Sequence, residues 1–141
     1  MSVEALDAIR KSIVVAAPVE RTWELFTERM GEWWPLVSHS IGGERTETAI
    51  VTPERIFERW QDGSERLWGR TLAWDPPHRL VFTWEVGPNG GNEVEVRFRS
   101  EGDGTRVDLE HRGWESGTPE GWRGYDSGWG FVLGRLEEAA A

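Results

Sequence analysis

The chain opens with two different spacings of apolar residues. Residues 9–15 follow a period of two, which predicts a β-strand. Pro18 suits the first turn of a helix, where its missing N–H is not needed, and apolar residues recur at helical spacing over 19–26. Gly31 interrupts this spacing, and Pro35 disfavours helical geometry in the residue before it. We therefore expect a strand followed by two short helices.

Short β-like runs separated by turn residues fill the chain from residue 45 to residue 112. Asp62-Gly63 is a strong hairpin signal, and the other turns combine Gly, Pro, Asn and Asp. Connections this short leave no room for crossover helices, so we expect antiparallel pairing and a sheet with one face in water. The expected strands are about 45–52, 54–60, 65–74, 79–86, 92–100 and 105–112.

A long amphipathic helix closes the chain. Thr118 is a candidate N-cap, and Pro119 fits the first helical position. The apolar stripe that follows has steps of three and four residues, which is typical of a helix that packs one face on a sheet. This stripe consists of Trp122, Tyr125, Trp129, Val132 and Leu136.

Several glycines interrupt this last helix, although each costs about 1 kcal/mol relative to alanine in a helix interior. Gly121, Gly124 and Gly128 lie beside the apolar stripe. Their missing side chains can leave space between helix and sheet for a bulky indole or a ligand, or they can allow close backbone packing. Both interpretations remain open from the sequence.

Composition narrows the function classes. The formal charge of −9 opposes binding to a phosphate backbone, so we expect no nucleic acid partner. Without cysteine the chain can form no disulfide, thiolate metal site or cysteine nucleophile. No apolar run is long enough to span a bilayer, and the first residues lack the features of a secretory signal, so we expect a cytoplasmic protein without membrane insertion.

Seven short motifs resemble a known family, the activator-of-heat-shock-protein-90-ATPase-like proteins of the START-related, birch-pollen-allergen-like (SRPBCC) superfamily. The resemblance covers about residues 9–138. The motifs are Ala17-Pro18-Val19-Glu20-Arg21-Thr22-Trp23, Trp33-Trp34-Pro35, Trp68-Gly69-Arg70, Trp74-Asp75-Pro76-Pro77, Leu80-Val81-Phe82-Thr83-Trp84, His111-Arg112-Gly113-Trp114 and Gly128-Trp129.

The resemblance implies an α+β helix-grip fold, in which a curved antiparallel sheet wraps a long C-terminal helix around an apolar cavity. We expect a single domain of this type over residues 1–141, which is the usual size of one domain. Superfamily relatives bind lipids, sterols, polyketides or hormones, and some are cyclases. The resemblance is therefore more specific for fold than for function.

His111 and Glu58 are the polar candidates. His111 shares strand parity with Val107 and Leu109, so it is expected to face the interior, where it can orient a ligand or be satisfied by its neighbours. Glu58 is undecided. A three-residue hairpin loop would place it opposite Trp68, whereas a two-residue loop would pair Phe57 with Trp68.

If Glu58 faces inward, it can pair with Arg70 or present a carboxyl with a raised pKa; otherwise it is an exposed strand carboxylate.

Ten tryptophans supply the other candidates, since tryptophan often lines ligand pockets or anchors partners. Trp84 shares parity with the apolar residues of its strand. Trp33 and Trp34 are adjacent, so we expect one of them to cover the cavity mouth or remain exposed. The ligand-binding residues expected from the sequence are Trp34, Glu58, Trp68, Trp84, His111, Trp122 and Trp129.

The leading hypothesis is non-enzymatic binding of a small apolar or aromatic molecule between the sheet and the last helix, without cofactor or metal. No nucleophile, phosphate-loop or metal-site motif is present, so no catalytic residue is assigned. One alternative is a cyclase-like or hydrolase-like enzyme that uses His111 or Glu58 as general acid or base. Another is a co-chaperone-like module that binds a protein partner through Trp33, Trp34 and the acidic surface.

Overall fold

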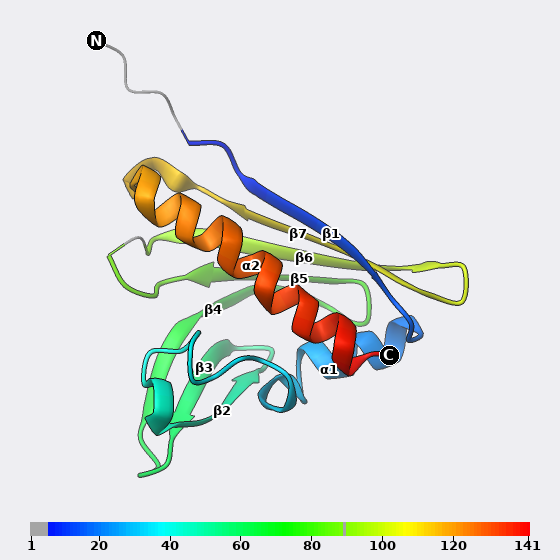
Figure 1. The fold of residues 1–141 in the computed structure, drawn as a ribbon, viewed down its shortest axis with the longest axis horizontal. Coiled ribbons are helices and arrows are strands. Elements are labelled where there is room, and N and C mark those ends of the chain that lie inside the picture. The colour runs from blue at the N-terminus through cyan, green and yellow to red at the C-terminus, as the bar shows by residue number, and fades with distance from the viewer. Residues whose placement is uncertain (1–5, 89) are drawn as a thin grey trace.

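A computed structural model describes residues 6–88 and 90–141. Within those residues, seven strands form one antiparallel sheet in the order β1-β7-β6-β5-β4-β3-β2, so the first and last strands lie side by side (Figure 1). The strands are β1 (Ile9–Val15), β2 (Thr46–Val51), β3 (Arg55–Trp60), β4 (Glu65–Asp75), β5 (Arg79–Trp84), β6 (Asn92–Glu101) and β7 (Gly104–Arg112).

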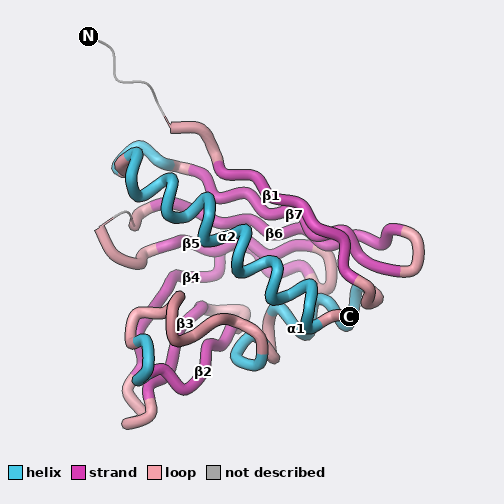
Figure 2. Tube along the Cα trace, viewed as in Figure 1, coloured by secondary structure: helices cyan, strands magenta, loops and turns pink. Residues whose placement is uncertain are grey.

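The sheet curls around the long helix α2 (Pro119–Ala139), while the short helix α1 (Val19–Phe26) lies near the C-terminal end of α2 (Figures 1 and 2). The Thr118 side chain accepts a hydrogen bond from the Gly121 N–H at 3.0 Å, so it caps α2 as expected. The predicted α+β helix-grip fold is confirmed.

The second expected helix is a single 3-10 turn, Met30–Glu32, with Gly31 at its centre. The other two 3-10 turns among the described residues are Gly43–Arg45 and Trp114–Ser116. A 3-10 turn is short because its hydrogen-bond geometry is poorer than that of an α-helix. The sequence pattern therefore located this element correctly but overestimated its length.

Of the two alternatives expected for Trp33 and Trp34, an exposed ring is wrong. Trp33 is 2% exposed and Trp34 is 6% exposed. The backbone leaves helical geometry at Trp33, so the two rings need not share one helical face. The indole N–H of Trp33 donates to the Leu25 carbonyl at 2.6 Å. The Trp34 ring packs on Trp68, with the ring centroids 5.0 Å apart. Neither ring is available as a surface anchor for a partner.

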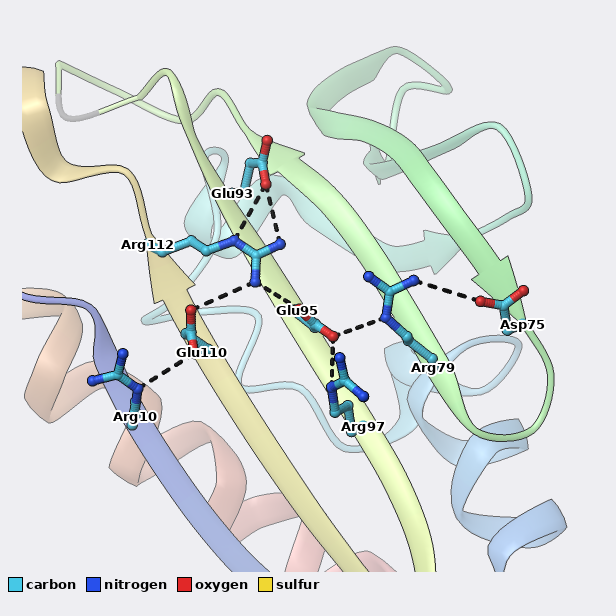
Figure 3. A network of polar contacts seen from close by, with 8 residues as sticks. All are labelled: Arg10, Asp75, Arg79, Glu93, Glu95, Arg97, Glu110 and Arg112. Atoms are coloured by element: carbon cyan, nitrogen blue, oxygen red, sulfur yellow. Dashed lines mark hydrogen bonds and ion pairs between the residues drawn. The ribbon is translucent and has the colours of Figure 1, made fainter.

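The outer face of the sheet carries an arginine–carboxylate network centred on Glu95 (Figure 3). The Glu95 carboxylate accepts hydrogen bonds or ion pairs from Arg79 at 2.8 Å, Arg97 at 2.6 Å and Arg112 at 2.6 Å. Burial raises the pKa of this carboxyl, but the three guanidinium groups lower it by a larger amount, so the pKa falls to about 2. The wet face predicted from strand alternation is therefore a network of paired charges.

Changing Glu95 to glutamine is expected to lower the free energy of unfolding by about 1–2 kcal/mol at pH 7, because three guanidinium groups lose a charged acceptor. Because the folded pKa lies below the ordinary value of 4.5, this stability is present above pH 4.5 and is lost as the pH falls towards 2. Urea unfolding at pH 7 and pH 2.5 measures both effects.

The matched control is Glu93→Gln, since the Glu93 side chain is 43% exposed and pairs with Arg112. Exposed pairs contribute less than about 1 kcal/mol. Equal losses in the two variants would contradict a central role for Glu95.

Candidate functional site

A cavity of about 380 Å³ lies between the sheet and α2. The sheet contributes residues from β4 and β5, α2 contributes one face, and the loop before β2 contributes residues 39–41. The lining residues are Trp34, His39, Ser40, Ile41, Trp68, Trp84, Val86, Gly121, Gly124, Tyr125, Gly128, Trp129 and Val132. This lining contains no Asp, Glu, Lys or Arg side chain.

Four indoles form a closed cycle of contacts in the wall of this cavity, and we call Trp34, Trp68, Trp84 and Trp129 the tryptophan cluster. The ring centroids of Trp34 and Trp68 are 5.0 Å apart, and those of Trp68 and Trp84 are 5.8 Å apart. Trp129 closes the cycle at 5.6 Å from Trp84 and 5.8 Å from Trp34. All four rings meet at tilted or edge-to-face angles, which aromatic pairs prefer.

Every indole N–H of the tryptophan cluster donates to an acceptor within the protein. Trp34 donates to the His39 carbonyl at 2.7 Å, and Trp68 donates to a Glu58 carboxylate oxygen at 2.6 Å. Trp84 donates to the Tyr125 hydroxyl at 2.9 Å, and Trp129 donates to the His111 Nδ1 at 3.0 Å. An indole has a single donor and no acceptor. The cluster therefore offers the cavity only apolar faces and C–H edges.

The glycines of α2 border the open space. Gly121, Gly124 and Gly128 line the cavity. A Cβ atom built at Gly124 would meet nothing within 4 Å, and one at Gly128 would lie 3.8 Å from the His39 ring. Close backbone packing would bring other atoms much nearer than this. Of the two interpretations left open by the sequence, the structure therefore favours space beside the helix.

His111 lies behind the cavity wall and is fully buried. Its Nδ1 accepts from the Trp129 indole, so Nε2 carries the proton and donates to the Asn92 side-chain oxygen at 2.7 Å. Burial lowers the pKa of His111 to about 3, so the ring is neutral at pH 7. His111 does not line the cavity. It instead fixes the orientation of Trp129.

Glu58 is also fully buried and lies behind the cavity wall. Burial raises the pKa of its carboxyl, but hydrogen bonds to the charged form lower it more, so the net shift is downward. Five donors among the described residues serve this carboxylate, at 2.6–2.8 Å: the Ile41 N–H, the Gly42 N–H, the Thr46 hydroxyl, the Trp60 indole and the Trp68 indole.

Of the two orientations that the sequence left open for Glu58, the inward one is correct. The expected consequences are wrong, because Glu58 has no donor from Arg70 among the described residues and its pKa is lowered rather than raised. It lies opposite Arg66 in the β3–β4 register, because a bulge leaves Trp68 unpaired between the Ile56↔Gly69 and Phe57↔Leu67 pairs. Neither hairpin loop length considered from the sequence includes such a bulge.

Trp122 lies at the start of α2 and does not line the cavity. Its indole N–H donates to the Asp7 carbonyl at 2.7 Å. Of the seven residues expected from the sequence, the structure thus brings the tryptophan cluster together around the cavity. It places Glu58 and His111 directly behind that cluster and Trp122 away from the cavity.

Sequence reasoning missed Tyr125 and His39 as polar residues of the cavity lining. Tyr125 lies on the apolar stripe of α2, and its hydroxyl was a signal that could have distinguished it from a core residue. His39 is in a loop, where periodicity gives no orientation. Its ring stacks on Phe131 at 5.1 Å, and its Nδ1 lies 2.7 Å from the Ser38 hydroxyl.

In the part of the chain that the structure describes, no three His, Cys, Asp or Glu side chains are grouped so that they could hold a metal ion. The same part contains no helix with the length and apolar character that crossing a membrane requires.

The family profile described as "Activator of Hsp90 ATPase homolog 1-like protein" matches residues 16–141. A search of curated protein sequences gives no significant match. Many solved structures, in contrast, are similar to this chain.

One similar structure is the anthrahydroquino-gamma-pyrone synthase Txn09 in complex with a molecule abbreviated SUM. It is 34% identical with a TM-score of 0.64, and the match covers 94% of this chain and 96% of that one. CalU16 from Micromonospora echinospora is 26% identical with a TM-score of 0.61, over 92% of this chain and 71% of that one. The Aha1 dimer from Colwellia psychrerythraea is 18% identical with a TM-score of 0.70, over 96% of both chains, and indicates a shared fold.

Proposed function

This chain belongs to the family of Activator of Hsp90 ATPase homolog 1-like proteins, and we propose that its cavity binds an uncharged, planar aromatic molecule without catalysing a reaction. Family and fold support a ligand-binding, cyclase-like or Hsp90-activator-like module and do not decide among the three. The chemistry of the cavity supports the first of these classes.

The observation that carries the proposal is an unfilled cavity beside four indoles whose N–H groups are all bonded elsewhere. A charged ligand would lose its hydration without gaining a partner, because the lining has no charged side chain. An uncharged aromatic ring has little hydration to lose and can pack edge to face against the indoles.

Buried area sets the expected affinity. A planar ligand that buries about 200 Å² of apolar surface gains about 5 kcal/mol at about 25 cal/mol/Å². Part of this gain offsets the loss of translational and rotational freedom. We therefore expect weak binding for a bare hydrocarbon and tighter binding only where polar contacts are added.

A variant that fills the cavity tests the proposal. Gly124→Leu is expected to weaken binding of the tricyclic hydrocarbon fluorene at least about tenfold, because Gly124 lines the cavity and the new side chain would compete with the ligand for that space. Equilibrium dialysis with the protein in excess over fluorene measures the dissociation constant.

The matched control is Gly130→Leu. Gly130 is an exposed residue of α2 with nothing within 4 Å of its Cβ position, and it does not line the cavity. Both variants gain helix propensity of similar size, about 1 kcal/mol. Equal binding of fluorene by the two variants would show that the ligand lies elsewhere, and no binding by the wild-type protein would refute the proposal.

A ring-forming reaction in the same cavity is the second candidate, and the 34% identity to the pyrone synthase Txn09 favours it. The alternative weighed from the sequence used His111 or Glu58 as general acid or base. Both groups lie behind the wall with their hydrogen-bonding atoms occupied, so Tyr125 and His39 are the residues that would contact a substrate. Incubation with the substrate of Txn09, followed by chromatography, would reveal a cyclised product.

A role as protein-binding module remains within the range of the family. The anchors considered from the sequence, Trp33 and Trp34, are buried, so a partner would have to use another surface. The rate of ATP hydrolysis by a chaperone, with and without the purified protein, tests this role directly.

A further inference from the structure

The Tyr125 hydroxyl belongs to the cavity lining, and its proton has no acceptor among the residues that the structure describes. The Trp84 indole donates to the Tyr125 oxygen at 2.9 Å. An indole N–H can only donate, so this bond uses a lone pair of Tyr125 and leaves its proton available. No hydrogen bond from the Tyr125 hydroxyl to an acceptor is present among residues 6–88 and 90–141.

The other polar groups of the lining are already engaged or lie at its edge. The Ser40 hydroxyl donates to the Leu36 carbonyl and accepts from the Gly43 N–H at 2.9 Å. His39 bonds through Nδ1, and its ring stacks on Phe131, which is 50% exposed, so water can reach it. Of the two hydroxyl groups in the lining, that of Tyr125 is therefore the one whose proton no described residue accepts.

The surroundings of Tyr125 hold its ring in place. Its centroid lies 5.3 Å from that of His111, 5.7 Å from that of Trp114 and 5.8 Å from that of Trp84. A hydroxyl that accepts a hydrogen bond also becomes a stronger donor, because hydrogen bonds in a chain polarise one another. The donor is thus both oriented and strengthened before any ligand arrives.

We infer that the Tyr125 hydroxyl donates a hydrogen bond to a carbonyl oxygen of the ligand, so that the cavity selects aromatic ketones and quinones over aromatic hydrocarbons. This inference deepens the proposed function and rests on it. A hydrocarbon bound beside this hydroxyl would exclude water from it without supplying a hydrogen bond in return. Sites built to bond a polar ligand group reject analogues that lack it for this reason.

The test compares fluorene with 9-fluorenone, which share one tricyclic skeleton and differ by a single carbonyl group. Equilibrium dialysis gives both dissociation constants for the wild-type protein and for Tyr125→Phe. The readout is the ratio of the two constants, because a loss of packing in the variant affects both ligands. The same comparison in a Trp84→Phe background removes the indole N–H that Tyr125→Phe would otherwise free to bond 9-fluorenone. We expect this ratio to change by about tenfold in favour of fluorene when the hydroxyl is removed.

An unchanged ratio in both backgrounds, with both ligands still bound, would overturn the role of Tyr125 and leave the proposed function standing. Absence of binding of either ligand to the wild-type protein would overturn both. A second measurement needs no variant: the infrared carbonyl band of 9-fluorenone bound to the wild-type protein should lie at lower wavenumber than in cyclohexane. A band at the cyclohexane position would also overturn the inference.

Discussion

Replacing Glu58 by glutamine is expected to lower the free energy of unfolding by about 3 kcal/mol or more at pH 7. Five donors point at the Glu58 carboxylate, and glutamine offers them one oxygen in place of two. At least two donors then face an amide NH₂ group instead of an acceptor. Each buried donor left without an acceptor costs about 1–3 kcal/mol.

The same substitution should also weaken ligand binding. One Glu58 oxygen bonds both the Trp68 indole and the Ile41 N–H, and these two residues line the cavity from different elements. Loss of that shared acceptor frees the loop before β2 from the sheet. We expect fluorene affinity to fall in parallel with stability.

Urea unfolding and equilibrium dialysis measure the two effects, with Glu54→Gln as the control. Glu54 is an exposed carboxylate just before β3, so its substitution should change the free energy of unfolding by less than about 0.5 kcal/mol. If the two glutamine variants are equally stable, the carboxylate of Glu58 does not hold the loop.

Acidification from pH 6.5 to pH 4.5 should destabilise the protein by about 2–3 kcal/mol through His111 alone. Burial lowers the pKa of His111 from 6.5 to about 3 in the folded protein. Between these values the unfolded chain binds a proton that the folded chain does not, so stability is full above pH 6.5 and falls as the pH decreases towards 3. Each pH unit in this window corresponds to about 1.4 kcal/mol.

Urea unfolding at pH 6.5, 5.5 and 4.5 measures this slope in the wild-type protein and in His111→Gln. Glutamine can accept from Trp129 and donate to Asn92 but does not titrate, so the slope should flatten. His78→Gln, at an exposed histidine, should retain it. A slope that is equally steep in His111→Gln would assign the acid sensitivity to other groups.

Strand parity explains how much of this site the sequence could predict. The period of two placed His111 with Val107 and Leu109 on the buried face, because a regular ladder alternates sides without exception. The same rule failed at Trp68, where a bulge adds one residue to β4 and changes the register. A bulge of this kind leaves little trace in the alternation of polar and apolar residues.

Contacts between distant segments account for most of what the sequence could not reveal. Glu58 is bonded by the backbone of Ile41 and Gly42, which are 17 and 16 residues away. Every residue except proline carries the same backbone N–H donor, so the sequence of side chains does not indicate which backbone group bonds Glu58. Helical spacing likewise grouped Tyr125 with the apolar stripe of the last helix, and such a stripe does not show which of its members borders a cavity.

The glycine row of α2 gives this architecture a simple route to new specificity. Glu58 and His111 bond the indoles of Trp68 and Trp129 from behind the cavity wall, whereas Gly121, Gly124 and Gly128 border the cavity without side chains. A Cβ atom added at Gly124 would contact no other segment of the protein within 4 Å. Larger side chains along this face of α2 are therefore expected to shorten the accepted ligand, one helical turn at a time.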